Sequence, residues 1–198
     1  MNTAHLLQRC QSGDGAAIDA FIQSHHAALY RLAYFVLLDP AEADEAVQDA
    51  FIAALAALDT YRGDLGELSL KSWLYTITIN ECRKRLRRRK ALERLKNTLL
   101  ILLHLERAGP THPEQELIQG EARAVLWREV CKLNEKHRLP VILYYYHDLP
   151  VAEIARILRV SEGTVHSRLF TARGRLRAAL LECGGEWVGA EAKEGSNG

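Results

Sequence analysis

The sequence has few of the features that mark secreted, zinc-bound or membrane-embedded proteins. Its longest uninterrupted apolar run, Ala50 to Leu58, has nine residues, whereas a helix needs about 20 to span a bilayer. The first fifteen residues have neither a basic leader nor an apolar core, so no secretory signal is expected. No CxxC pair of the kind used in zinc sites occurs, because the four cysteines are far apart: Cys10, Cys82, Cys131 and Cys183. We therefore expect reduced thiols, no membrane insertion and a cytoplasmic location.

Alternating apolar residues, which would indicate β-strands, are also scarce. Apolar residues recur instead at spacings of three and four, which predicts an all-α fold. Gly63 and Gly66 predict a loop over 61–68, and Gly109-Pro110 with Pro113 predicts a connector between a larger N-terminal and a smaller C-terminal domain. The expected helices cover residues 4–12, 15–37, 41–59, 69–107, 114–132, 136–147, 151–158 and 162–182.

Charge is balanced in total but strongly sorted along the chain. The 198 residues carry 26 Lys and Arg against 25 Asp and Glu, yet residues 39–81 hold nine acids and two bases. The block RKRLRRRK, Arg83 to Lys90, places seven positive charges in eight positions, and residues 156–177 are again rich in arginine. Such blocks favour contacts with a phosphate backbone, although a solvated helix face would look the same. Two basic segments beside an acidic one indicate two kinds of partner.

The helix expected over 41–59 has two faces of different kinds. Glu42, Glu45 and Asp49 fall within about 60° of one another, while Val47, Phe51, Leu55 and Leu58 gather opposite them. Paired carboxylates can hold a metal for acid–base chemistry, as in a nucleic-acid-processing enzyme using Glu45 and Asp49. No nucleophile, histidine base or phosphate-cradling glycine loop lies nearby, and the adjacent His25 and His26 point different ways on a helix. We therefore expect no enzyme, no metal and no other cofactor, and the acidic face is either solvated or docks on a basic protein surface.

The segment LPVAEIARILRVSEGTVHSRLFTARGRLRAAL, residues 149–180, has the pattern of a helix-turn-helix. Its first helix carries Val151, Ile154, Ala155 and Leu158, and Ser161 is a good N-cap for the second. The second helix has a stripe suited to burial, made by Val165, Leu169, Ala172 and Leu176.

The side chains that point away from this stripe suit the major groove of DNA. Ser167, Thr171 and His166 can hydrogen-bond base edges, and Phe170 can pack on a thymine methyl group. A helix pair packed inside a bundle is the alternative, but Phe170 on a polar face that contains glycine argues against it. The candidate duplex-binding residues are Gly163, Thr164, His166, Ser167, Arg168, Phe170, Thr171 and Arg173.

Two motifs together resemble the sigma-70 family of bacterial RNA polymerase specificity subunits, in its extracytoplasmic-function (ECF) branch. The C-terminal AEIARILRVSEGTVHSRLFTARGRL resembles the fourth conserved region of that family, which reads the minus-35 promoter element. The N-terminal AEADEAVQDAFIAALAALDTYRGD, followed by SWLYTITINECRKRLRRR, resembles its second region. The resemblance implies domains at 1–96 (region 2) and 116–183 (region 4), a linker at 97–115 and a flexible tail at 184–198.

The resemblance also implies partners for the sorted charges. It places Asp44, Glu45, Gln48 and Asp49 against the clamp helices of the largest polymerase subunit, with the polymerase flap as a second contact. It assigns the next helix to the minus-10 element, where the family captures a flipped base in a pocket at an energetic cost of a few kcal/mol. The implied minus-10 residues are Arg62, Leu70, Trp73, Asn80, Arg83, Arg87 and Arg88.

Some of these assignments keep a structural alternative. Trp73 is either a core residue or a platform for a base, and Asn80 bonds either a base edge or a buried backbone group. The loop before Trp73 contains LGELSLKS and is longer than is usual in the family, while His166 and Thr171 stand where many relatives have arginine or lysine. The promoter sequence therefore does not carry over. The apolar Leu99 to Leu103 segment either packs on the first domain or binds an inhibitor.

The sequence thus predicts a transcription initiation factor that binds core RNA polymerase and promoter DNA. The resemblance adds an anti-sigma factor as a further partner. The second hypothesis is a stand-alone helix-turn-helix regulator, which would bind its DNA tightly without polymerase and would leave the acidic helix without a role.

Overall fold

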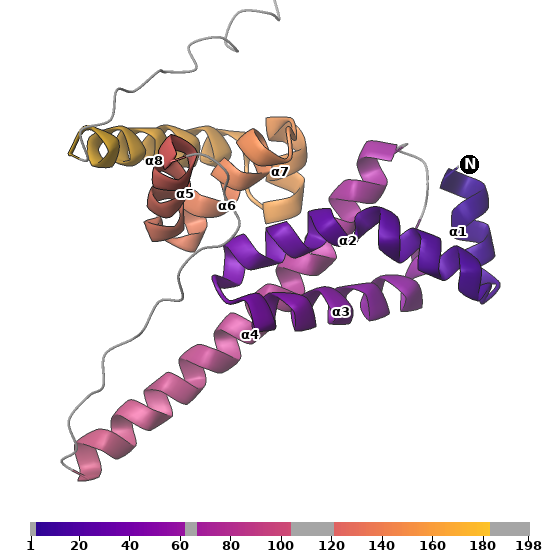
Figure 1. The fold of residues 1–198 in the computed structure, drawn as a ribbon, viewed down its shortest axis with the longest axis horizontal. Helices are drawn as coiled ribbons and strands as arrows, with labels where there is room; N and C mark the ends of the chain where they lie inside the picture. The colour runs from indigo at the N-terminus through magenta and orange to yellow at the C-terminus, as the bar shows by residue number, and fades with distance from the viewer. Residues whose placement is uncertain (1–2, 62–66, 104–120, 183–198) are drawn as a thin grey trace, which may run out of the picture.

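The computed structural model describes residues 3–61, 67–103 and 121–182, and these residues form helices and no strand, which confirms the all-α prediction (Figure 1). Predicted features at Arg62, at 104–120 and at 183–198 lie outside the described residues. The elements are α1 (Thr3–Gln11), α2 (Gly15–Leu37), α3 (Pro40–Ala56), a 3-10 turn η1 (Leu58–Thr60), α4 (Glu67–Leu103), α5 (Glu121–Lys132), α6 (Glu135–Val141), a π-helical turn η2 (Ile142–Tyr146), α7 (Val151–Leu158) and α8 (Glu162–Glu182).

Side-chain caps set the start of the N-terminal helices. Asp14 caps α2 by accepting a hydrogen bond from the amide of Ala17 at 3.2 Å. Asp39 caps α3 by accepting a hydrogen bond from the amide of Glu42 at 2.9 Å, and Pro40 occupies the first turn of that helix. Between these helices Leu38 adopts a left-handed conformation with φ 56° and closes α2. The tight turn makes α2 and α3 neighbours.

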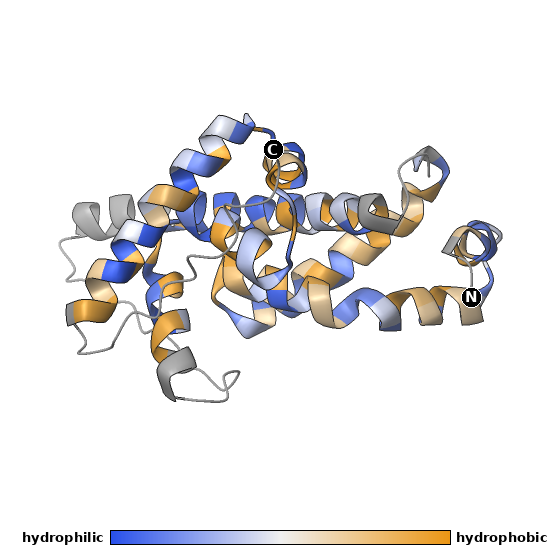
Figure 2. Ribbon diagram, turned by 90° about the horizontal axis from the view of Figure 1, so that it is seen from above, coloured by the Kyte–Doolittle hydropathy of each residue, from blue (hydrophilic) through white to orange (hydrophobic). Residues whose placement is uncertain are grey.

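Helices α2, α3 and α4 pack around the core of the N-terminal unit. Phe21, Leu32, Val47 and Leu74 are all buried there, with Phe21 and Phe51 in edge-to-face contact. Coloured by hydropathy, the helices alternate between hydrophobic and hydrophilic positions, as amphipathic helices do (Figure 2). The far half of α4 extends away from the other helices (Figure 1).

The C-terminal unit is built from α5 to α8. The sequence predicts one helix over 136–147, but the structure interrupts it at η2. Pro140 lies inside α6 and has no amide hydrogen to donate, and the chain then widens so that the amide of His147 bonds the carbonyl of Ile142. The wider turn buries Ile142 and Leu143 in the core.

The two units pack against each other, with α7 on α4 and α6 on α2 (Figure 1). None of the helices in the described ranges combines the length and the hydropathy needed to span a bilayer. The backbone of Leu99 to Leu103 continues α4 as a helix. Whether this stretch packs on the first domain or binds an inhibitor stays a prediction.

Candidate functional site

Helices α7 and α8 form the helix-turn-helix that the sequence predicts. Arg159 takes a left-handed conformation with φ 55° to end α7, and Ser161 accepts a hydrogen bond from the amide of Thr164 at 3.2 Å to start α8. The buried stripe predicted for α8 is confirmed, because its four residues are all buried: Val165, Leu169, Ala172 and Leu176. Of the residues named on α7, Ile154, Ala155 and Leu158 are buried and Val151 is half-buried.

The opposite face of α8 reaches solvent. Phe170 is 77% exposed, which places a large aromatic ring in water. Gly163, His166 and Ser167 are also exposed, and the remaining candidates are half-exposed: Thr164, Arg168, Thr171 and Arg173. The hydroxyl of Thr171 donates to the carbonyl of Ser167 at 2.9 Å, so toward a base it acts as an acceptor. An exposed phenylalanine among polar groups is a surface suited to a base-lined groove.

A polar groove lies beside the first turns of α8. It has a volume of about 470 Å³, and α6 contributes two side chains to it, Lys136 and His137. The Arg175 guanidinium lies 3.5 Å from Nδ1 of His137. Burial lowers the pKa of His137, and the positive charges of Arg175, Lys136 and Arg168 lower it further. The sequence prediction did not include Lys136 and His137, because the spacing of apolar residues within α6 does not show that this helix lies beside α8.

The acidic face of α3 is exposed, and it is organised by an arginine. Arg85 of α4 is 17% exposed and makes two ion pairs, with Glu45 at 2.6 Å and with Asp49 at 2.5 Å. Gln48 donates to Asp44 at 3.0 Å on the same face. The four predicted polymerase contacts are therefore brought together. Ile52, one turn beyond Gln48, is 67% exposed and extends this face, although the sequence prediction omitted it.

The basic block on α4 does not form one surface. Arg85 and Arg89 turn toward the acids of α3, with Arg89 lying 3.7 Å from Glu42. Arg83 pairs with Glu135 of α6 at 3.0 Å. Arg87 and Arg88 are exposed. Of the three predicted minus-10 arginines in this block, two therefore face solvent and one lies in a contact between the two units.

The other predicted minus-10 residues occupy different environments. Leu70 is 3% exposed and lies in the core of the N-terminal unit. Trp73 is half-buried, with its ring 5.1 Å from that of Tyr61. Asn80 is half-buried, and its spacing of seven from both Trp73 and Arg87 puts these three residues on one face of α4. The structure thus aligns a tryptophan, an amide and an arginine along one side of the helix.

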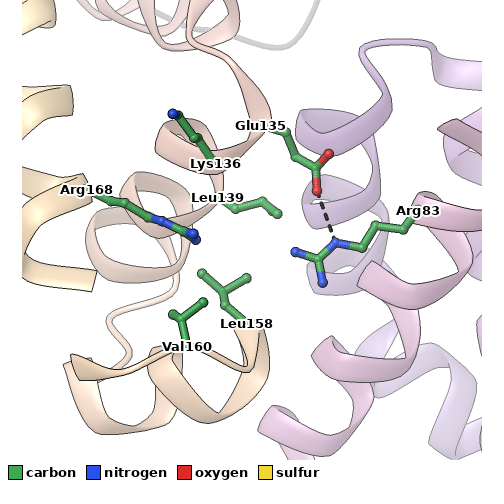
Figure 3. A pocket seen from close by; sticks show the side chains of 7 residues that line it. All are labelled: Arg83, Glu135, Lys136, Leu139, Leu158, Val160 and Arg168. Carbon is green, nitrogen blue, oxygen red and sulfur yellow. Dashed lines mark hydrogen bonds and ion pairs between the residues drawn. The ribbon is translucent and has the colours of Figure 1, made fainter. Parts of the chain in front are cut away.

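The C-terminal unit covers the adjacent face of α4. Ser72 donates to Glu153 of α7, the hydroxyl of Tyr75 lies 3.0 Å from Nδ1 of His147, and Arg83 bonds Glu135. Spacings of three and eight place Ser72, Tyr75 and Arg83 along one side of the helix. Arg83 and Arg168, predicted to bind two different DNA elements, line the same cavity of about 200 Å³ (Figure 3).

A second contact joins the end of α2 to the C-terminal unit. The rings of Phe35 and Trp127 stack with their centroids 4.7 Å apart. Arg138 is buried and donates to the carbonyl of Val36 at 3.0 Å, so its charge lies at the C-terminal end of α2. Burial lowers the pKa of Arg138. The sequence predicts two domains and a connector, but it gave no sign of these contacts.

Two titratable groups at the contact have strongly shifted pKa values. Burial raises the pKa of Tyr75 to about 12. Burial, with a contribution from the positive charge of Arg31, lowers the pKa of His147 to about 4, against an opposing effect of Asp148. Both residues are therefore neutral at pH 7 in this arrangement. Within the described ranges, His, Cys, Asp and Glu side chains form no group of three that could hold a metal ion.

Two family models match the chain. Residues 21–92 match the one described as Sigma-70 region 2, and residues 123–176 match the one described as Sigma-70, region 4. The "ECF RNA polymerase sigma factor SigM" of Mycobacterium tuberculosis is 32% identical over 186 residues, which cover 90% of this chain and 85% of SigM. The "ECF RNA polymerase sigma factor SigW" of Bacillus subtilis is 27% identical over 181 residues, covering 89% of this chain and 95% of SigW.

Solved structures share this fold. CnrH, in complex with the cytosolic domain of CnrY, matches with a TM-score of 0.60 at 26% identity, covering 90% of this chain and 96% of that one. The sigma factor RpoE of Bartonella quintana, in complex with the anti-sigma factor NepR, matches with a TM-score of 0.65 at 23% identity, covering 82% and 96%. The likeness to RpoE shows the fold alone.

Proposed function

We infer from its membership of the ECF branch of the sigma-70 family that this chain is a sigma factor, which binds core RNA polymerase and directs promoter-specific initiation of transcription. The main structural support for this function is the presence of two different exposed surfaces in one chain. An acidic face on α3 suits a protein partner, and an exposed face on α8 suits a DNA groove. A sigma factor of this kind regulates transcription without catalysing a reaction, so we assign no catalytic residue.

We assign the polymerase contact to the acidic face of α3. Asp44, Glu45, Gln48 and Asp49 are exposed or half-exposed there, and carboxylates favour a basic partner surface such as the clamp helices implied by the family resemblance. The flap of the polymerase would contact the C-terminal unit. Because RNA polymerase and promoter DNA are its proposed partners, we propose a cytoplasmic location.

We assign minus-10 recognition to α4 and minus-35 recognition to α8. The face with Trp73, Asn80 and Arg87 offers a ring for stacking, an amide for a base edge and a cation for a phosphate. The exposed face of α8 offers hydroxyls and Phe170 to the duplex. In this proposal residues 1–96 form the domain that binds polymerase and the minus-10 element, residues 116–183 form the domain that binds the minus-35 element, and residues 97–115 link them.

The packed arrangement of the two units does not suit simultaneous contact with both promoter elements. Minus-10 and minus-35 are about 25 base pairs apart, which is on the order of 85 Å along the duplex at 3.4 Å per base pair. Arg83 and Arg168 nevertheless line one small cavity (Figure 3). The units therefore separate when the factor engages a promoter. An anti-sigma factor that binds the packed form would oppose this step.

Gel filtration with bacterial core RNA polymerase tests the function. We expect the chain to co-elute with core enzyme, and the complex to retain promoter DNA that neither component retains alone. A chain that ran alone but still shifted duplex DNA would instead support the stand-alone regulator. The two hypotheses predict different results, because a sigma factor needs the acidic face of α3 to bind polymerase, whereas a stand-alone regulator needs only α8 to bind DNA.

A further inference from the structure

The polar groove beside α8 has the composition of an anion site. Its described lining includes Lys136 from α6 with Ser161, Thr164 and Arg168 of the helix-turn-helix. No carboxylate and no apolar side chain is among the described residues that line it. Two cations and four hydroxyl groups, the latter including Ser167 and Thr171, thus surround about 470 Å³ of space beside the helix assigned to DNA.

The positive charges in this groove are not neutralised locally. Lys84 and Lys132 each lie 2.6 Å from a glutamate one turn earlier, whereas no ion pair of Lys136 or Arg168 occurs among the described residues. Glu135, next in sequence to Lys136, lines the neighbouring cavity together with Lys136 and Arg168, but its carboxylate accepts a hydrogen bond from Arg83 (Figure 3). Burial lowers the pKa of His137, and the positive charges of Arg175, Lys136 and Arg168 lower it further, which disfavours a third positive charge in the groove. The positive charges of Lys136 and Arg168 are therefore available to bind an anionic ligand.

The position of the groove selects DNA over other anions. Ser167 and Thr171 belong both to its lining and to the face of α8 assigned to the minus-35 element, so the two surfaces are continuous. A recognition helix in the major groove is flanked by sugar–phosphate backbones, and a neighbouring helix reaches one of them. Helix α6 is such a neighbour.

We propose that Lys136, which lies outside the helix-turn-helix, binds a backbone phosphate of the minus-35 duplex in the groove that it shares with Arg168, Ser161 and Thr164. The contact fixes the register of α8 on the duplex and carries no base preference. This inference rests on the proposed function, because it assumes that α8 reads duplex DNA.

The test uses the complex of the full chain with core polymerase and a fluorescently labelled promoter duplex, titrated at several salt concentrations. Lys136→Ala is expected to weaken binding about five- to tenfold at about 0.1 M salt, by the same factor on all minus-35 variants. The slope of log K against log salt should become shallower by about 0.9. Lys132→Ala removes one positive charge from the same unit and should change neither quantity, while Lys136→Arg should restore both.

A duplex with single neutral methylphosphonate linkages identifies the contact. One linkage near the minus-35 element should weaken binding by the wild-type complex and leave binding by Lys136→Ala unchanged. A Lys136→Ala effect equal to that of Lys132→Ala, or one that depends on the minus-35 sequence, would overturn the proposal. Failure of the wild-type chain to bind polymerase would instead refute the proposed function, and the same titrations would then use the chain alone on the duplex.

Discussion

Acidification should loosen the contact between the two units through His147. The ring packs 4.7 Å from the ring of Tyr75 in the other unit, and its pKa is lowered to about 4 by burial and by Arg31. In an unfolded or separated chain the pKa returns to about 6.5. Because the pKa is lower in the packed state, the stabilisation is complete above pH 6.5 and is lost as the pH falls toward 4.

The size of the effect follows from the difference between a pKa of about 6.5 in the unfolded chain and a pKa of about 4 in the packed state. At about 1.4 kcal/mol for each unit of pKa, the packed state loses at most about 3.5 kcal/mol at low pH, and about 2 kcal/mol of this is lost between pH 7 and pH 5. Other histidines contribute too, so the informative quantity is a difference between two proteins. His147→Gln keeps a polar side chain that can accept from Tyr75 but cannot be protonated.

Urea unfolding of both proteins from pH 8 to pH 4.5 measures this difference. The free energy of unfolding of the wild type should fall by about 2 kcal/mol more than that of His147→Gln between pH 7 and pH 5. Parallel pH profiles for the two proteins would refute the reasoning, because they would show that His147 titrates normally in the packed state.

Three further predictions concern the proposed interfaces. Glu45→Lys with Asp49→Lys should abolish co-elution with core polymerase while circular dichroism stays unchanged, because both carboxylates lie on the exposed face of α3; co-elution of the folded double variant would remove the docking assignment. Ser167→Ala should change the preferred minus-35 sequence at one position by about 1 to 3 kcal/mol, measured by selection from a promoter library, and an unchanged preference would contradict the assignment of α8. Arg87→Ala with Arg88→Ala should weaken promoter binding uniformly and flatten its salt dependence, whereas an unchanged slope in a salt titration would leave these arginines as a solvated surface.

Periodicity within a helix was a good guide to its faces. The buried stripe of α8 and the two faces of α3 follow from spacings of three and four, because a helical residue shares its side with residues one turn away. The caps at Asp39 and Ser161 likewise depend on local hydrogen bonds to the next turn.

Contacts between helices were much harder to predict. The sequence shows that Arg85 is basic, but not that it faces Glu45 and Asp49, which lie 40 and 36 positions earlier. The same holds for Arg138, whose partner Val36 is 102 positions away. A single sequence does not indicate which residues contact each other when they lie this far apart in the chain. The wide turn at η2 was also missed, because the helix predicted over 136–147 ran through Pro140 and its apolar spacing does not distinguish an α-helix from a π-helical turn.

Run-off transcription from a promoter library with core polymerase and the purified chain tests the central claim most directly. The account predicts new transcripts that start a fixed distance from a shared minus-10 and minus-35 pair and that disappear when the chain is omitted. Duplex binding by the chain without any polymerase-dependent transcript would contradict it.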